Sequence, residues 1–79
     1  MSENDVKSRV KKVISHVLKI EESDIVDNAN FIFDLGADSM QSLELVAAFE
    51  EEFNIEMDED KALEVQNVSS AVAFIESYL

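Results

Sequence analysis

The sequence predicts an all-α protein: a small antiparallel four-helix bundle, three helices longer and one short, forming a single domain over residues 1–79. Three observations lead to this fold. Apolar side chains recur at helical spacing in several segments. The chain contains no proline and only one glycine, so helices can continue without interruption. Apolar residues make up 47% of the 79 residues, enough for a real but modest core.

The first helix is predicted over residues 3–18, where apolar side chains lie on one face and Ser2 or Asn4 can cap the start. Residues 19–38 lack helical periodicity and are predicted to form a long structured loop between helices 1 and 2, with one helical turn near residues 23–26. A loop with this many apolar residues is expected to pack onto the helices as an ordered lid. These residues are Ile20, Ile25, Val26, Phe31, Ile32, Phe33 and Leu35.

The second helix is predicted over residues 39–53, because Asp38 followed three residues later by Gln41 is a capping-box pattern. Its core stripe has the spacing i, i+4 and i+8, and its polar stripe points the other way. A third stripe between them is either the edge of the core or a partly exposed docking strip flanked by carboxylates. The core stripe is Leu45, Phe49 and Phe53, the polar stripe Gln41, Glu44 and Glu51, and the intermediate stripe Met40, Leu43 and Ala47.

Two further helices complete the bundle. Asp58 can cap a short third helix over about residues 59–64, and Asn67 can cap a fourth. The fourth helix carries apolar residues at helical spacing. They are Val68, Ala71, Val72, Ile75 and Leu79.

Charge is the strongest global feature: 18 acidic against 6 basic residues give a net charge of −12. Beyond residue 19 the chain has one basic residue, Lys61. Such a surface repels nucleic acid and anionic lipid, so neither is expected as a partner, and it attracts basic protein surfaces. No apolar run approaches the length of a membrane span, and the N-terminus resembles neither a secretory signal nor a transit peptide. We therefore expect a monomer without membrane insertion, in the bacterial cytoplasm or in an organelle matrix after removal of a transit peptide.

Neither catalysis nor a defined metal site is predicted, although the acidic face is compatible with weak, diffuse binding of divalent ions. Ser39 lies in no hydrolase elbow, which would read G-x-S-x-G. The only histidine, His16, falls beside the apolar face of a different helix, and the chain has no cysteine to share a metal with it. An EF-hand loop beginning at Asp58 would place Ala62 and Leu63 at positions 5 and 6, where an oxygen ligand and glycine are required.

Ser39 is distinguished by its position. If Asp38 caps the helix, Ser39 is its first residue, close to free backbone N–H groups and the positive end of the helix dipole, where a phosphate ester is stabilised. Gly36 permits a tight turn just before it. A serine modified by another enzyme fits this corner, and so does a serine that only helps to cap the helix.

The segment Asp34-Leu35-Gly36-Ala37-Asp38-Ser39 resembles the phosphopantetheine attachment motif of acyl carrier proteins. The resemblance spans nearly the whole chain, from Asn30-Phe31 through Glu44-Leu45-Val46 to the closing helix. It implies that Ser39 carries 4′-phosphopantetheine, donated by coenzyme A through a phosphopantetheinyl transferase, and that the thiol of this arm holds acyl chains as thioesters. The chain would then be a carrier rather than an enzyme.

The resemblance also implies where partners and cargo bind. Fatty-acid synthase enzymes with basic patches would dock on Asp38, Met40, Leu43, Glu44, Ala47, Glu50 and Glu51. The mostly aliphatic residues expected around an acyl chain are Phe31, Leu45, Val46, Val65, Val68 and Ile75, with Val10 and Phe53 as further candidates and the two phenylalanines as larger walls. Gln41 and Ala47 depart from the family's usual acidic and larger apolar residues, which weakens the docking prediction.

The resemblance favours the discrete carrier of a dissociated (type II) fatty-acid synthase, because of Gly36-Ala37 and the three glutamates before Phe53. The alternative is a discrete carrier of a polyketide, peptidyl or D-alanyl pathway, and the triplet Asp38-Ser39-Met40 is reminiscent of the D-alanyl type. A purely structural role in a larger assembly is a third possibility.

Overall fold

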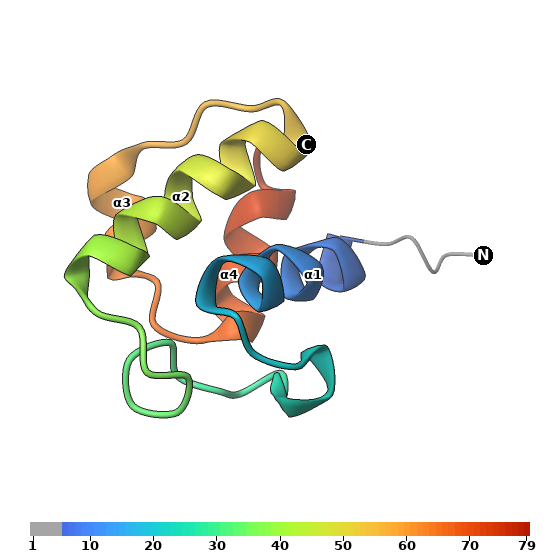
Figure 1. Ribbon diagram of the computed structural model, residues 1–79. Coiled ribbons are helices and arrows are strands. Elements are labelled where there is room, and N and C mark those ends of the chain that lie inside the picture. Colours follow the sequence, from blue (N-terminus) through green and yellow to red (C-terminus); the bar gives the residue numbers. More distant parts are fainter. Residues whose placement is uncertain (1–5) are drawn as a thin grey trace.

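The computed structural model describes residues 6–79, which form four α-helices and one long loop (Figure 1). The helices are α1 (Val6–Leu18), α2 (Ser39–Phe53), α3 (Glu59–Glu64) and α4 (Val68–Glu76). Within this described range there is no β-strand, only an isolated bridge between Asn30 and Asn67. No helix in it is long and apolar enough to cross a membrane. The predicted all-α, four-helix fold is confirmed.

The predicted helix caps are confirmed at three of the four helices. The side chain of Asp38 accepts a hydrogen bond from the backbone N–H of Gln41 at 2.8 Å, and the Gln41 side chain accepts one from the N–H of Asp38 at 3.2 Å. Asp58 caps α3 and Asn67 caps α4 by the first of these bonds alone, because their side chains accept the backbone N–H groups of Lys61 and Ser70. The predicted start of the first helix at residues 3–5, with its cap at Ser2 or Asn4, lies outside the described residues.

The core forms where α1 packs against α2 and α4, while α3 packs mainly against α2 (Figure 1). Val10, Ile14, Val68 and Ile75 are fully buried there. The predicted core stripe of α2 is also buried, as its spacing of i, i+4 and i+8 requires. The prediction for Leu79 is wrong: α4 ends at Glu76, and Leu79 is exposed beyond it.

The long loop is ordered, but only part of it packs onto the helices. It contains a 3₁₀ turn, η2 (Glu22–Asp24), one residue earlier than predicted, and it buries Ile25 and Phe31. The prediction that the loop packs onto the helices is therefore confirmed only in part, since Val26, Ile32 and Phe33 are exposed. Phe33 is 87% exposed.

Two lysines of α1 join that helix to the loop through one carboxylate. Lys7 Nζ and Lys11 Nζ each lie 3.0 Å from an oxygen of Asp27. Hydrogen bonds from Lys7 and then from Lys11 hold the pKa of Asp27 below its ordinary value. The loop is therefore attached to α1 by an interaction that requires a charged Asp27.

This attachment predicts a pH dependence. A carboxyl group with a lowered folded-state pKa stabilises the fold above its unfolded pKa, about 3.9, and loses that contribution as the pH falls through the folded pKa. We expect Asp27→Asn to lower the thermal midpoint at pH 7, and the difference from wild type to shrink steadily below about pH 4. Thermal melts of both proteins from pH 7 to pH 2.5 measure it. A difference independent of pH would contradict an electrostatic role for Asp27.

Candidate functional site

Ser39 lies where the long loop turns into α2. It is the first residue of that helix and is exposed. Gly36 has φ +77°, in the left-handed region that side chains with a Cβ rarely adopt. No neighbouring atom would contact a Cβ at this position, so it is the backbone angle of the chain reversal before Ser39 that favours glycine. Because Asp38 supplies the cap, the hydroxyl of Ser39 is not needed to start the helix. This geometry favours the modification hypothesis over the capping hypothesis.

The loop before Ser39 is held by its own hydrogen bonds. The side-chain oxygen of Asn30 accepts the backbone N–H groups of Ile32 and Phe33, each at 2.9 Å. Asp34 Oδ2 accepts the N–H of Asn30 at 2.7 Å. The N–H of Ala37 donates to the carbonyl of Phe31 at 2.8 Å. These bonds fix the backbone from residue 30 to residue 37 and present Ser39 at a defined corner.

A cavity of about 200 Å³ opens beside this corner. Its α2 wall begins at Ser42, one helical turn after Ser39, and continues inward through Leu45, Val46 and Phe49. Loop residues and α3 form the outer walls, and α4 closes the inner end. For comparison, an apolar hole of about 150 Å³ can hold a benzene ring. An apolar group of several carbons attached through Ser39 therefore has a space to enter.

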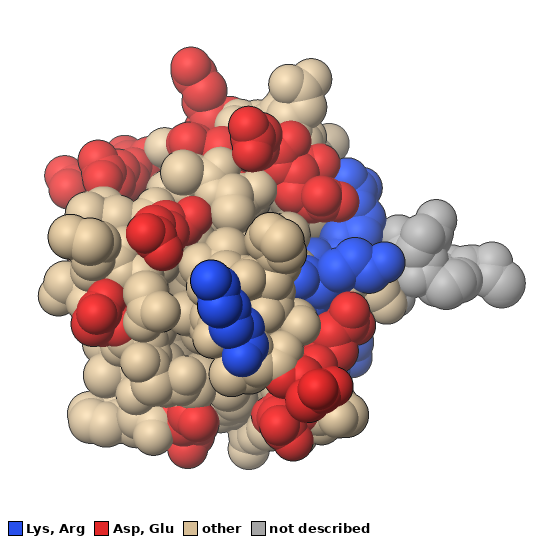
Figure 2. Space-filling view, in the orientation of Figure 1, with Lys and Arg blue, Asp and Glu red and all other residues tan. Residues whose placement is uncertain are grey.

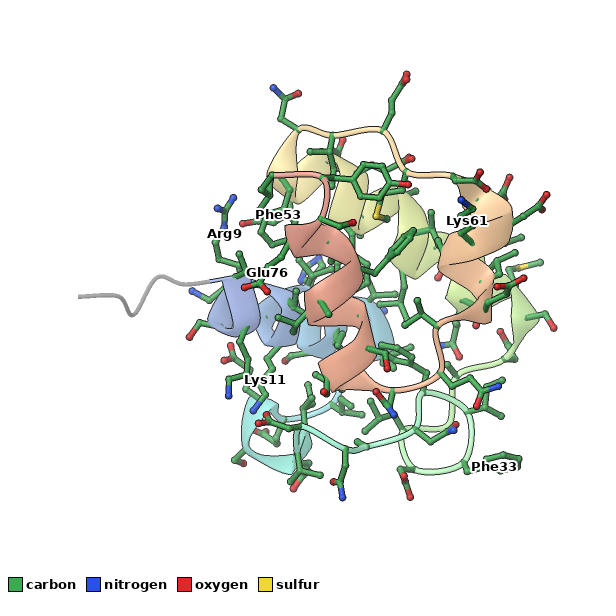
Figure 3. The ribbon with its side chains drawn as sticks, turned by 180° about the vertical axis from the view of Figure 1, so that it is seen from behind. Arg9, Lys11, Phe33, Phe53, Lys61 and Glu76 are labelled. Atoms are coloured by element: carbon green, nitrogen blue, oxygen red, sulfur yellow. The ribbon has the colours of Figure 1, made fainter. Side chains whose placement is uncertain are left out.

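Five of the six residues predicted to form an acyl pocket line this cavity: Phe31, Leu45, Val46, Val65 and Ile75. Val68 does not, because it is fully buried in the contact between helices. The further candidates Val10 and Phe53 also lie elsewhere: Val10 is sealed in the core, and the Phe53 ring packs under Arg9, 4.4 Å from its guanidinium (Figure 3).

Sequence reasoning missed several lining residues. Phe49 was assigned only to the core stripe, although the same periodicity places it one turn beyond Leu45. Met57, Phe74 and Ala71 carry no local signal for a cavity, because their position depends on how α3 and α4 are placed against α2. The remaining residues missed are Asn30, Ile32, Phe33, Ser42, Ala62, Leu63 and Gln66.

The residues predicted to dock partners are mostly accessible. Met40 and Leu43 are 69% and 44% exposed, and Glu44, Ala47, Glu51 and Asp38 are also on the surface. Glu50 is less accessible, because it is partly buried and its Oε2 accepts the backbone N–H of Met57 at 2.8 Å. Glu50 therefore fixes the segment between α2 and α3, while Glu44 and Glu51 remain available to a partner.

Charge is unevenly distributed over the surface. Figure 2 shows acidic side chains over most of the visible face, including the region of the long loop, whereas the basic side chains lie mainly on α1. Between residues 6 and 79 no group of three or more acidic or histidine side chains is placed to hold a metal ion. His16 lies on α1 beside Lys12 and Glu51, on a surface separate from the cavity next to Ser39. The arrangement can attract a cationic surface and accept a group at Ser39.

Comparison with known proteins agrees with this geometry. The family model described as a phosphopantetheine attachment site matches residues 8–75. Among solved structures, a provisionally named acyl carrier protein from Mycobacterium tuberculosis superposes with a TM-score of 0.83. It is 22% identical in sequence, and the match covers 91% of this chain and 96% of that one. At this identity the likeness concerns the fold.

Proposed function

This chain belongs to the phosphopantetheine-attachment family, and on that premise we propose that Ser39 is its attachment residue and that it serves as the discrete acyl carrier of a dissociated fatty-acid synthase. Membership implies a carrier domain with a covalent 4′-phosphopantetheine, a transferase that installs it, and acyl cargo. The single observation that carries the proposal is the exposed Ser39 hydroxyl one helical turn from the opening of an apolar cavity.

The residues around Ser39 fit such an arm. In the proposed modification, Ser39 Oγ bonds to phosphorus, the phosphoanhydride of coenzyme A breaks, adenosine bisphosphate leaves and the hydroxyl proton goes to solvent or to the transferase. The resulting phosphodiester lies at a helix start, where backbone N–H groups and the helix dipole favour negative charge. Once attached, the arm supplies a thiol for thioester formation. No thiol of the chain itself competes for the acyl group, since there is no cysteine.

The cavity favours a fatty acyl cargo over the alternatives. Burying a methylene group contributes roughly 0.8 kcal/mol, so an alkyl chain gains from entering a space lined by Leu45, Val46 and Ile75. A D-alanyl or peptidyl cargo is short and polar and would gain little. A polyketide cargo, partly apolar, remains the second candidate.

Mass spectrometry of the protein purified from its native host tests this choice. We expect Ser39 to carry the arm with malonyl and saturated acyl groups of several lengths. D-alanyl or aminoacyl groups on the arm would contradict the fatty-acid proposal while leaving the attachment site intact.

Partner docking is predicted to be electrostatic and centred on α2. Glu44→Lys combined with Glu51→Lys reverses two exposed charges beside the apolar strip of Met40 and Leu43. We expect the rate of transfer by a basic partner enzyme to fall about tenfold at low salt. Kinetics at increasing salt measure the effect, because exposed charges are screened over about 8–10 Å near physiological ionic strength. A matched control, Glu21→Lys with Glu22→Lys, changes the net charge by the same amount, but in the long loop and not on α2. Equal effects of the two double variants would move the interface elsewhere.

A further inference from the structure

The opening of the cavity has an apolar rim that the buried core does not explain. Ile32 and Phe33 lie on the loop side, and Leu63 lies on α3. All three line the cavity, yet they are 56%, 87% and 44% exposed. We call these three residues the rim. Large apolar groups so exposed at the opening of a cavity indicate a ligand that covers them.

The exposure of Phe33 is imposed by the backbone. Its N–H is fixed at 2.9 Å from Asn30 Oδ1, and the neighbouring bonds of Asn30, Asp34 and Ala37 close the loop on both sides. Figure 3 shows the Phe33 ring at the outer edge of this loop, pointing away from the helices. An exposed side chain changes rotamer within picoseconds to nanoseconds. The ring can therefore turn over the opening without movement of the backbone.

The size of the cavity shows which part of an acyl chain would remain outside it and need to be covered by the rim. By proportion to a benzene-sized hole, about 200 Å³ accommodates roughly eight carbons. The methyl end of an acyl chain would lie against Phe49 and Ile75, and the thioester end would face Ser39. In a longer chain the methylenes nearest the thioester remain at the opening, between Phe33 and Leu63.

We propose that Phe33, supported by Ile32 and Leu63, is a residue that determines chain-length specificity by covering the thioester-proximal methylenes of chains too long for the cavity. This inference rests on the proposed function, because it requires an acyl arm on Ser39. The effect must grow with chain length: a chain of six carbons fits inside and gains nothing from the rim, whereas one of twelve carbons extends past it.

The test uses the full chain, modified at Ser39 and loaded with hexanoyl or dodecanoyl groups. The measurement is the rate constant of thioester cleavage by hydroxylamine, with the thermal midpoint of each loaded form alongside. The variants are Phe33→Ser and the conservative Phe33→Leu. The matched control is Val26→Ser, which removes an exposed apolar side chain from the same loop, away from the cavity.

We expect Phe33→Ser to accelerate cleavage of the dodecanoyl form roughly three- to tenfold, since burial of part of a phenylalanine ring is lost. The hexanoyl form should change less than twofold, Phe33→Leu should keep most of the protection, and Val26→Ser should match wild type. Equal acceleration at both chain lengths, or none, overturns the inference alone. Failure of wild-type Ser39 to accept the arm overturns the proposed function and this inference together.

Discussion

Ser39→Ala is expected to abolish attachment of the phosphopantetheine arm completely. Alanine has no hydroxyl to bond to phosphorus, and Ser39 is the only serine in the attachment motif and at the start of α2. Incubation with a phosphopantetheinyl transferase and coenzyme A, followed by intact-protein mass spectrometry, should show one arm on wild type and none on the variant. An arm on Ser39→Ala would mean that another serine is the attachment residue.

The fold should survive this substitution, so that loss of modification cannot be attributed to unfolding. The hydrogen bonds that begin α2 come from Asp38 and Gln41, and the Ser39 side chain is exposed. We expect a change in unfolding free energy within about 0.5 kcal/mol, as for other surface substitutions. Ser42→Ala is the matched control: it removes a hydroxyl one turn later, which donates to the Asp38 carbonyl at 3.1 Å, and should leave modification intact.

Loading an acyl chain is expected to stabilise the protein in proportion to chain length until the cavity is full. At roughly 0.8 kcal/mol per methylene, an eight-carbon chain gains up to about 5 kcal/mol before the cost of widening the cavity. A net gain of about 2 kcal/mol would raise the thermal midpoint by roughly 10 °C in a domain of this size. Melts of the holo, acetyl, hexanoyl and octanoyl forms at one ionic strength measure it. Identical midpoints would mean that the chain remains in solvent.

Ala71→Leu separates occupation of the cavity from other effects of the cargo. Ala71 is buried on α4 and lines the cavity, so a leucine there takes up part of the space intended for the chain. We expect the holo form to keep its fold, with a change of about 1–3 kcal/mol at most, while the octanoyl-dependent rise is largely lost. Ala73→Leu, an exposed position on the same helix, should retain that rise. An undiminished rise in Ala71→Leu would place the chain elsewhere.

The sequence by itself determined the helices, the N-terminal caps of α2, α3 and α4, and the candidate attachment residue. The second helix runs from Ser39 to Phe53 as predicted, and Asp38, Asp58 and Asn67 cap their helices. These features depend on short-range physics: a cap bonds to an N–H three residues later, and a buried stripe follows from 3.6 residues per turn. The position of Ser39 at the start of a helix follows from the same local rules.

Only the tertiary structure decided which apolar residues surround the cavity and which remain on the surface. Periodicity marks a residue as facing inward, but an unfilled space exists where helices fail to meet, and that depends on the placement of α3 and α4 against α2. Val68 is therefore sealed in a helix contact, while Phe74 faces the cavity. Phe33 is exposed for a related reason: the Asn30 side chain, hydrogen-bonded within a loop that is also tied to Gln66, fixes the direction of its backbone. Neither the helix placement nor this loop closure has a periodic signature in the chain.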